Sequence, residues 1–250
     1  MLIKAAINGG RSRAEHAAVP ETPDEQATAV ADCLKAGASA IHLHVRSNSS
    51  DASSQSKKES LYAEDVTRTL LAVRSVSPNA KIGVSTGAWI LPDPTARLQA
   101  VTAWEVLPDF ASVNFSEDGA TELAKLLLSR GVEVEAGLCD AEAAEIFLKS
   151  GLAPRCIRVL FEPQEQEMKH ALENVGAMEK VLKPGLLKLS RPLPFLLHGT
   201  EATAWPMMAE AITRGYDVRV GLEDTLILPD GRIAQDNVEL VAEAVRRAIR

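Results

Sequence analysis

The stretch Ile41-His42-Leu43-His44-Val45-Arg46 has the apolar, β-branched character of a buried strand and carries two histidines at alternate positions. It follows Lys35-Ala36-Gly37-Ala38, where the glycine is typical of a helix end, and it precedes a polar run over residues 47–60. Because side chains alternate between the two faces of a strand, both imidazoles lie on the same face. Neutral imidazole is the commonest metal ligand, so the pair predicts a site for a divalent cation; the alternative is one core and one surface histidine.

Strand-like and helix-like segments alternate along the rest of the chain. The strand patterns cover 3–7, 41–46, 81–85, 110–114, 132–138, 156–161, 193–197 and 218–222. The helix patterns cover 23–36, 61–76, 94–104, 117–130, 141–150, 164–182, 200–214 and 237–249. Eight such units in 250 residues predict a (β/α)8 TIM barrel that forms a single domain over residues 1–250. An open doubly wound sheet is disfavoured because no G-x-G-x-x-G sequence follows the first strand.

Local signals fix some of these boundaries. Thr22-Pro23-Asp24-Glu25 has a cap residue, a proline at the first helical position and an acid three residues after the cap. This combination is a capping box and predicts a helix start. Asp140 is expected to cap a second helix, which Gly151 ends.

Composition excludes several classes of protein. The net charge of −7 argues against a nucleic-acid partner, because binding to phosphates requires clustered cations. No apolar run is long enough to span a bilayer, and the N-terminus enters a strand without a signal-peptide pattern. Cys33, Cys139 and Cys156 are odd in number and far apart, so we expect reduced thiols in a cytoplasmic protein.

Polar residues gather where the predicted strands end, which is where TIM barrels place their chemistry. They are Asn8, His42, His44, Ser85, Thr86, Ser112, Asn114, Glu135, His198, Arg219, Glu223 and Asp224. Because the second and eighth strands flank the first in a closed barrel, we expect His42, His44 and Glu223 to converge. Two histidines and one carboxylate with an open position are typical of a catalytic zinc site.

At these residues the chain resembles the β-keto acid cleavage enzymes, whose best-known member is 3-keto-5-aminohexanoate cleavage enzyme. The segments that carry the resemblance are collinear and cover most of the chain. They are Thr22-Pro23-Asp24-Glu25, Ala36-Gly37-Ala38, Ile41-His42-Leu43-His44-Val45-Arg46, Val84-Ser85-Thr86-Gly87, Ala111-Ser112-Val113-Asn114, Arg219-Val220-Gly221-Leu222-Glu223-Asp224 and Asn237-Val238-Glu239-Leu240-Val241. His-x-His-x-Arg and Arg-Val-Gly-x-Glu-Asp are the specific motifs among them.

The resemblance implies a zinc-dependent acyltransferase that converts a β-keto acid and acetyl-CoA into acetoacetate and a new CoA ester. It also implies a homo-oligomer, a tetramer or a dimer. The zinc ligands would be His42, His44 and Glu223, and the residues assigned to catalysis would be Arg219, Asp224 and Ser85. The substrate contacts would be Asn8, Arg11, Arg46, Thr86, Gly87, Ser112, Asn114 and Glu135.

One departure from the family pattern concerns charge near the substrate. The family has a glutamate after the first strand in a Thr-Gly-Ala-Glu pattern, whereas this chain reads Asn8-Gly9-Gly10-Arg11. The reversal from an acid to Arg11 favours an acidic or neutral keto acid over one that carries an amino group. The loop after His-x-His-x-Arg also differs and here begins Ser47-Asn48-Ser49-Ser50.

Two other functions stay open at this point. The first is a different metal-dependent lyase or hydrolase on the same barrel. Amidohydrolases also use His-x-His, but they need further ligands from central strands, and here His170 is expected inside a helix and His198 stands alone. The second is a catalytically lapsed barrel that only binds a metabolite, which Arg11 in place of the acid favours.

Overall fold

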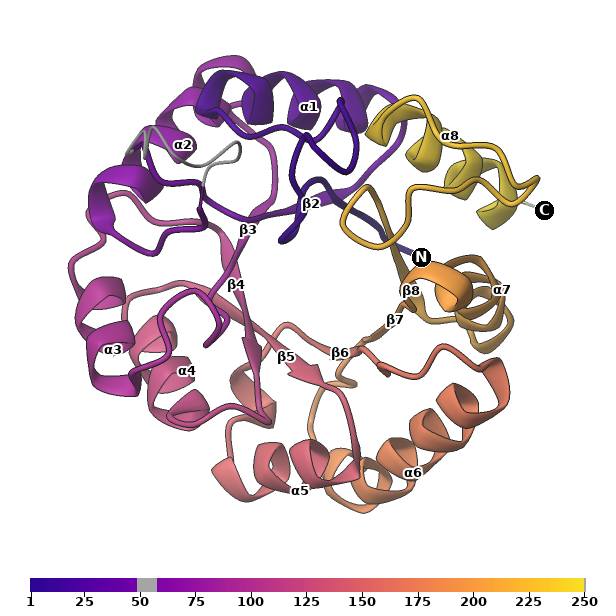
Figure 1. The fold of residues 1–250 in the computed structure, drawn as a ribbon. Helices are drawn as coiled ribbons and strands as arrows, with labels where there is room; N and C mark the ends of the chain where they lie inside the picture. The colour runs from indigo at the N-terminus through magenta and orange to yellow at the C-terminus, as the bar shows by residue number, and fades with distance from the viewer. Residues whose placement is uncertain (49–57, 250) are drawn as a thin grey trace.

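The computed structural model describes residues 1–48 and 58–249 and shows a closed parallel barrel surrounded by helices (Figure 1). Each strand pairs with its sequence neighbours, and β1 pairs with β8 to close the ring. The strands are β1 (Ile3–Ala6), β2 (Ala40–Leu43), β3 (Ile82–Ser85), β4 (Phe110–Asn114), β5 (Glu133–Leu138), β6 (Arg158–Phe161), β7 (Phe195–Leu197) and β8 (Asp217–Val220). The predicted TIM barrel is therefore confirmed.

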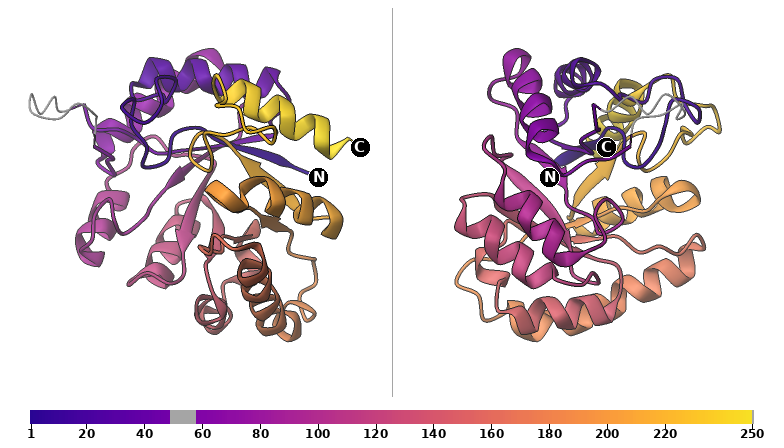
Figure 2. Two further views of the ribbon diagram at one scale, coloured as in Figure 1. Left: turned by 45° about the vertical axis from the view of Figure 1, so that its right-hand side comes forward. Right: turned by 60° about the vertical axis from the view of Figure 1, so that its left-hand side comes forward.

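The helices lie on the outside of the barrel, as the two further views show (Figure 2). They are α1 (Pro23–Lys35), α2 (Ala63–Val76), α3 (Pro94–Thr102), α4 (Ala120–Ser129), α5 (Ala141–Ser150), α6 (Met168–Leu186), α7 (Ala204–Arg214) and α8 (Asn237–Ala248). Short 3-10 turns at Ala153–Arg155 and Glu201–Thr203 precede β6 and α7. None of the helices in the described part of the chain has the length and apolar character needed to cross a membrane.

The predicted caps are present. Thr22 accepts a hydrogen bond from the Glu25 backbone while the Glu25 side chain accepts one from the Thr22 backbone, so the capping box is complete. Asp140 caps α5, and Gly151 ends that helix with φ of 71°. These short-range signals place the helix ends correctly because their partners are only a few residues away.

Other boundaries differ from the expectation. The strand predicted over 41–46 leaves the sheet after Leu43, because the His44 backbone bonds to the Asn8 side chain and not to a neighbouring strand. The helix predicted over 164–182 runs from Met168 to Leu186, and the one predicted over 117–130 begins at Ala120. Most of the polar loop over 47–60 lies outside the described residues.

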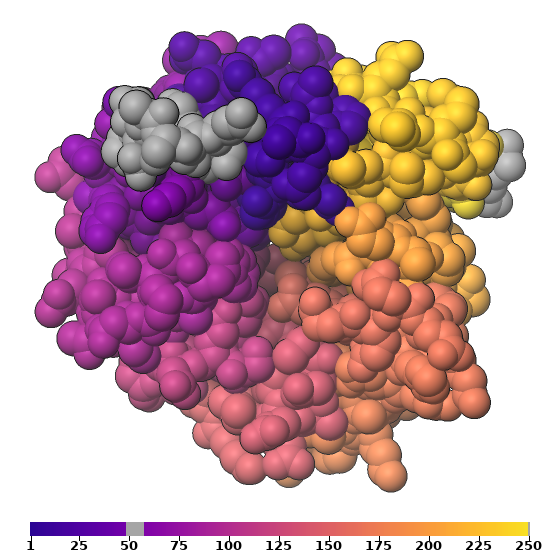
Figure 3. Space-filling model, in the orientation of Figure 1, coloured from indigo at the N-terminus to yellow at the C-terminus, as the bar shows by residue number. Residues whose placement is uncertain are grey.

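The core fills the space between the strands and the helices as well as the barrel interior. Gly83 leaves room for the Phe110 side chain, since a β-carbon on Gly83 would overlap the phenyl ring. Cys33 and Cys156 are buried free thiols, and burial raises the pKa of each to about 12. In the orientation of Figure 1, the space-filling view shows a hollow at the centre of the molecule (Figure 3).

Candidate metal centre and active site

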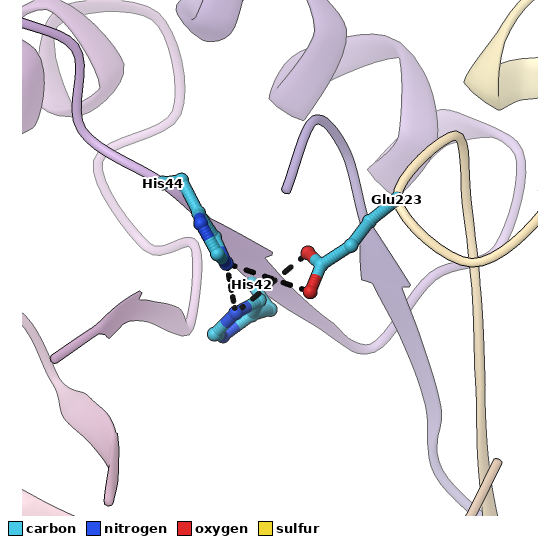
Figure 4. Close-up of side chains that lie close together, drawn as sticks. All are labelled: His42, His44 and Glu223. Carbon is cyan, nitrogen blue, oxygen red and sulfur yellow. Dashed lines mark hydrogen bonds and ion pairs between the residues drawn. The ribbon is translucent and has the colours of Figure 1, made fainter. Parts of the chain in front are cut away.

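His42, His44 and Glu223 converge at one end of the barrel (Figure 4). The Nε2 atoms of the two histidines are 3.1 Å apart. The Glu223 carboxylate lies 3.7 Å from Nε2 of His42 and 3.4 Å from Nε2 of His44. The convergence expected from the strand order is therefore present, with one donor atom of each residue directed at the same small volume.

The segment Asn8-Gly9 after β1 contacts two of these ligands, His44 and Glu223. The Asn8 side chain accepts a hydrogen bond from the His44 backbone at 2.8 Å and donates one to the His44 carbonyl at 2.9 Å. Gly9 has φ of +54°, and a β-carbon there would lie within 2.9 Å of Cβ, Cγ and Cδ of Glu223. Real β-carbons essentially never approach so closely, so glycine at this position is required for Glu223 to reach the histidines.

The outer nitrogen of each histidine ring is also engaged. Nδ1 of His44 bonds to the Glu59 carboxylate, and Nδ1 of His42 lies 3.3 Å from Oγ of Ser112. The Ser112 hydroxyl donates its only proton to Glu135 at 2.9 Å, so its oxygen is left to accept from His42. Both rings therefore place a proton on Nδ1 and turn Nε2 toward Glu223. This is the arrangement that metal-binding histidines normally show.

Glu135, expected as a substrate contact, is fully buried in the barrel interior. It forms an ion pair with Lys4, and its other oxygen lies 3.3 Å from Nε of Arg158. Burial alone would raise the pKa of Glu135, but the charges of Lys4 and Arg158 outweigh burial and lower this pKa to about 2. The structure thus connects Glu135 to the metal-ligand cluster through Ser112.

Arg219 and Asp224 form a buried pair beside Glu223. Arg219 donates to both oxygens of Asp224, at 2.7 to 3.1 Å, and also to Glu223. Burial would raise the pKa of Asp224, but Arg219 and then His198 hold this pKa below its usual value. Asp224 is therefore a carboxylate fixed by a two-pronged guanidinium.

His198 enters the cluster from the end of β7. Its Nδ1 atom is 3.4 Å from Asp224, and its Nε2 atom is 3.8 Å from Glu162. Burial and Arg219 act to lower the pKa of His198, but Asp224 and Glu162 outweigh them and raise it. Sequence reasoning placed His198 among the strand-end residues but did not identify Glu162 as its neighbour.

The charges around the two ligand histidines differ. Burial, which outweighs the charge of Glu223, holds the pKa of His42 well below its usual value. Burial also acts to lower the pKa of His44, but Glu223 and Glu59 outweigh it and raise this pKa to about 9. Positive charge is thus favoured at His44 by two carboxylates, of which Glu223 is also placed to bind a cation.

Arg11 and Arg46, the two arginines expected as substrate contacts, both lie at the loop that follows β1. The Arg11 side chain contacts the Glu223 carbonyl at 3.4 Å and forms an ion pair with Glu201, a residue with φ of 46°. Arg46 is buried and donates to the carbonyls of Gly9 and Arg11, so it supports this loop. Arg11 retains some exposure, with 16% of its side chain accessible.

The remaining predicted residues lie in β3 and β4 or directly after β3. Ser85 pairs with Ser112 in the sheet register, and its Oγ lies 3.4 Å from the Gly87 backbone nitrogen. Thr86 donates to the Ser112 carbonyl at 2.7 Å, and Asn114 donates to Glu117 at 2.9 Å. Ser85, Thr86 and Ser112 are buried, with less than a tenth of each exposed.

Two residues beside His44 were missed by the sequence analysis. Glu59 belongs to the segment that ends the polar loop, and Trp89 follows Ser85-Thr86-Gly87. Nothing in the local pattern around either residue indicates a contact with the histidines. Only the position of each segment over the barrel end brings them there.

The donor set fits a divalent metal ion. It consists of two Nε2 atoms and one carboxylate, and these atoms lie within 4.8 Å of one another. Oε2 of Glu223 is buried and has no hydrogen-bond partner among the described residues. A bound cation would compensate the charge of this oxygen. Two histidines and one carboxylate leave a coordination position open, as catalytic sites require.

Comparison with known proteins shows the family to which the chain belongs. The family model described as beta-keto acid cleavage enzyme matches residues 1–250. The chain belongs to the β-keto acid cleavage enzyme family. Within this family it is 31% identical to the 3-keto-5-aminohexanoate cleavage enzyme of Fusobacterium nucleatum, over 99% of this chain and 91% of that protein. The enzyme of the same name from Acetoanaerobium sticklandii is 30% identical over the same shares of the two chains.

Solved structures with the same fold include ObcA. A ternary complex of ObcA with a C4-CoA adduct and oxalate superposes with a TM-score of 0.71 at 16% identity. The match covers 92% of this β-keto acid cleavage enzyme family member but only 64% of the ObcA chain. At this level of identity the comparison supports the barrel fold alone.

Proposed function

We propose that this protein is a zinc-dependent acyltransferase of retro-Claisen type. In this proposal a β-keto acid and acetyl-CoA are converted into acetoacetate and the CoA ester of the remaining acyl group. The observation that carries the proposal is the convergence of His42, His44 and Glu223 beside the Arg219–Asp224 pair. Family membership and two relatives named 3-keto-5-aminohexanoate cleavage enzyme support the choice of reaction.

A zinc ion held by His42, His44 and Glu223 would act as a Lewis acid toward the keto group of the substrate. Asp224 would take the proton from the substrate carbon between the two carbonyl groups. Arg219 holds the Asp224 carboxylate through two of its nitrogen atoms, so the base is already oriented before the substrate binds. Because Asp224 is 1% exposed, bulk water has little access to the base.

Hydroxyl and amide groups would orient the substrate. Ser85 assists the catalytic pair in this proposal, and Thr86, Gly87, Ser112 and Asn114 line the same end of β3 and β4. Asn8 and Glu135, expected as substrate contacts, have indirect roles in this proposal: Asn8 bonds to the His44 backbone, and Glu135 accepts a hydrogen bond from Ser112.

The Arg11 side chain would select the substrate class. It lies beside Glu223 and its charge is balanced by Glu201 at the entrance. A carboxylate on the distal part of a keto acid could replace Glu201 as the partner of Arg11, whereas an amino group could not. We therefore propose that an acidic or neutral β-keto acid is the substrate.

A coupled assay tests this function. Purified protein is incubated with acetyl-CoA, zinc and a panel of β-keto acids, and acetoacetate and the new CoA ester are both measured. We expect equal amounts of the two products from at least one acid. Hydrolysis of substrate without CoA-ester formation would instead favour a lyase or hydrolase, and ligand binding without turnover would favour a lapsed barrel.

Metal analysis provides the independent arm of the test. Wild-type protein is expected to hold one zinc ion per chain, and His44→Ala is expected to lose it. His170→Ala is the matched control, because His170 is an exposed histidine of α6 that pairs with Glu167. Equal zinc content in wild type and His44→Ala would refute the proposed site.

The resemblance also favours a cytoplasmic homo-oligomer, a tetramer or a dimer. Light scattering coupled to size-exclusion chromatography tests the oligomeric state. A monomer that is fully active would contradict this part of the proposal.

A further inference from the structure

Glu59 connects His44 to an exposed tryptophan. The Glu59 carboxylate accepts a hydrogen bond from Nδ1 of His44 and another from Nε1 of Trp89, the latter at 3.1 Å. The indole also stacks on the His44 imidazole, with ring centroids 6.0 Å apart and planes inclined by 24°. His44 is therefore held at its outer nitrogen by an acid and on one ring face by an aromatic side chain.

The backbone places both residues where these contacts form. Glu59 pairs with Arg46 in an antiparallel bridge, and the Ser60 backbone donates to the Val45 carbonyl at 2.9 Å. These bonds align the residues that follow His44 with the residues around Glu59. On the other side, a β-carbon on Gly87 would overlap the Trp89 ring, so glycine at this position admits the indole.

We propose that Glu59 and Trp89 are positioning residues of the metal centre, which hold the His44 ring so that Nε2 presents its lone pair to the ion. This inference rests on the proposed metal site but assigns two residues that the family resemblance does not include. A carboxylate that accepts the Nδ1 proton fixes the tautomer and increases the basicity of Nε2. An indole stacked on the ring blocks rotation away from Glu223.

The two ligand histidines are supported differently. Ser112, which supports His42, is a neutral hydroxyl in the barrel interior, whereas Glu59 is a charged group with 13% of its side chain exposed. Trp89 is 55% exposed, so its outer face meets solvent above the site. The support for His44 is therefore the part of the metal centre that a surface substitution can weaken without disturbing the barrel.

Zinc affinity, measured by competition with a chromophoric chelator, tests the inference. We expect Glu59→Gln to bind zinc about 10- to 100-fold more weakly than wild type. Trp89→Phe keeps the stacked ring but loses the N–H donor, so its loss is expected to be smaller than that of Trp89→Ala. Glu117→Gln is the matched control, because Glu117 is a carboxylate near Trp89 that bonds to Ala88 and Asn114 and to neither ligand histidine.

Two readouts do not depend on turnover. Nitrogen chemical shifts of His44 are expected to report an Nδ1-protonated ring in zinc-loaded wild type and a mixed state in Glu59→Gln. Zinc is also expected to change the fluorescence of wild type, and this response should disappear in Trp89→Phe, since Trp104 and Trp205 are buried and bond to Leu61 and Ile227.

The outcomes separate this inference from the proposed function. If Glu59→Gln and Trp89→Ala bind zinc as tightly as wild type, the positioning role is wrong while the metal site stands. If wild type itself binds no zinc, both are wrong. Glu59→Asp, which keeps the charge but shortens the side chain, provides the same decision should the glutamine variant not fold.

Discussion

Gly9 and Glu223 are in contact across the β1–β8 closure, with no room between them for a β-carbon. Gly9 has φ of +54°, a conformation in which any other L-residue is strained by about 1–2 kcal/mol. Because Gly9 has no side chain, Glu223, which follows β8, can reach the two histidines of the β2 segment. This relationship leads to the first prediction.

Gly9→Ala is expected to displace the Glu223 carboxylate from the histidines and to lower both zinc affinity and activity. Gly10→Ala is the matched control, since among the described residues a β-carbon there would meet only Oε2 of Glu59 at 3.7 Å, an ordinary contact. Zinc affinity and kcat of the two variants are to be compared. Equal effects of the two substitutions would show that a general disturbance of the loop, and not displacement of Glu223, is responsible.

Arg219→Lys keeps the positive charge but cannot fork onto Asp224. Lysine would leave at least one of the hydrogen bonds to Asp224 unmade, and hydrogen bonds to charged groups contribute about 1.5–3 kcal/mol. We therefore expect kcat to fall by about tenfold to a hundredfold. Steady-state kinetics at saturating substrate measures this change, and a lysine variant with unchanged kcat would remove Arg219 from the proposed reaction.

Arg11→Glu restores the charge that the family pattern has after its first strand. We expect kcat/KM for keto acids with a second carboxylate to fall by about tenfold or more, and kcat/KM for amino-bearing keto acids to rise. Arg13→Glu is the control, because Arg13 lies in the same loop but pairs with Glu25 on α1. If both variants change specificity equally, the effect is one of general loop charge and not of a substrate contact.

Glu135 gives a prediction for acid stability. Its folded-state pKa of about 2 is below that of an unfolded glutamate, so its contribution is present above the unfolded value and is lost as pH falls through about 2. Urea unfolding between pH 2 and pH 6 is expected to show a steeper loss of stability for wild type than for Lys4→Met/Glu135→Leu. The double variant removes both charges, because Glu135→Gln alone would leave Lys4 buried without its partner, a cost of about 3–5 kcal/mol.

The opposing shifts of this pair set how large that effect can be. Burial lowers the pKa of Lys4 although Glu135 opposes it, so part of the benefit at the acid is offset at the amine. Glu133→Gln on the same strand is the control, since Glu133 pairs with Lys81 at the surface, where both side chains are more than 40% exposed. A parallel pH dependence of wild type and the double variant would contradict a charged Glu135.

The barrel and part of the site could be predicted from the sequence because the relevant signals act over short distances. Period-two apolar segments, helical apolar periods and the capping box at Thr22 involve residues a few positions apart. The alternation of side chains on one strand places His42 and His44 on the same face without any knowledge of the fold. Strand order in a closed ring then brings Glu223 near them.

Contacts between loops could not be predicted in this way. Glu59, Trp89 and Glu162 lie in segments whose local sequence is compatible with solvent exposure, and their partners are far along the chain. Glu135 was expected at the substrate but is buried beside Lys4, because the inward face of a barrel strand is lined by the strands across the ring. β2 ends at Leu43, earlier than predicted, because the side chain of Asn8 takes the place of a strand partner.

The sequence by itself determined the eight strand–helix units, the helix caps and the pair of histidines on one strand face, since each follows from backbone periodicity and local hydrogen bonding. Only the tertiary structure decided which groups support those histidines and which side chains reach the open end of the site. These contacts depend on packing between distant segments. The space left by Gly9 admits Glu223, and the space left by Gly87 admits Trp89.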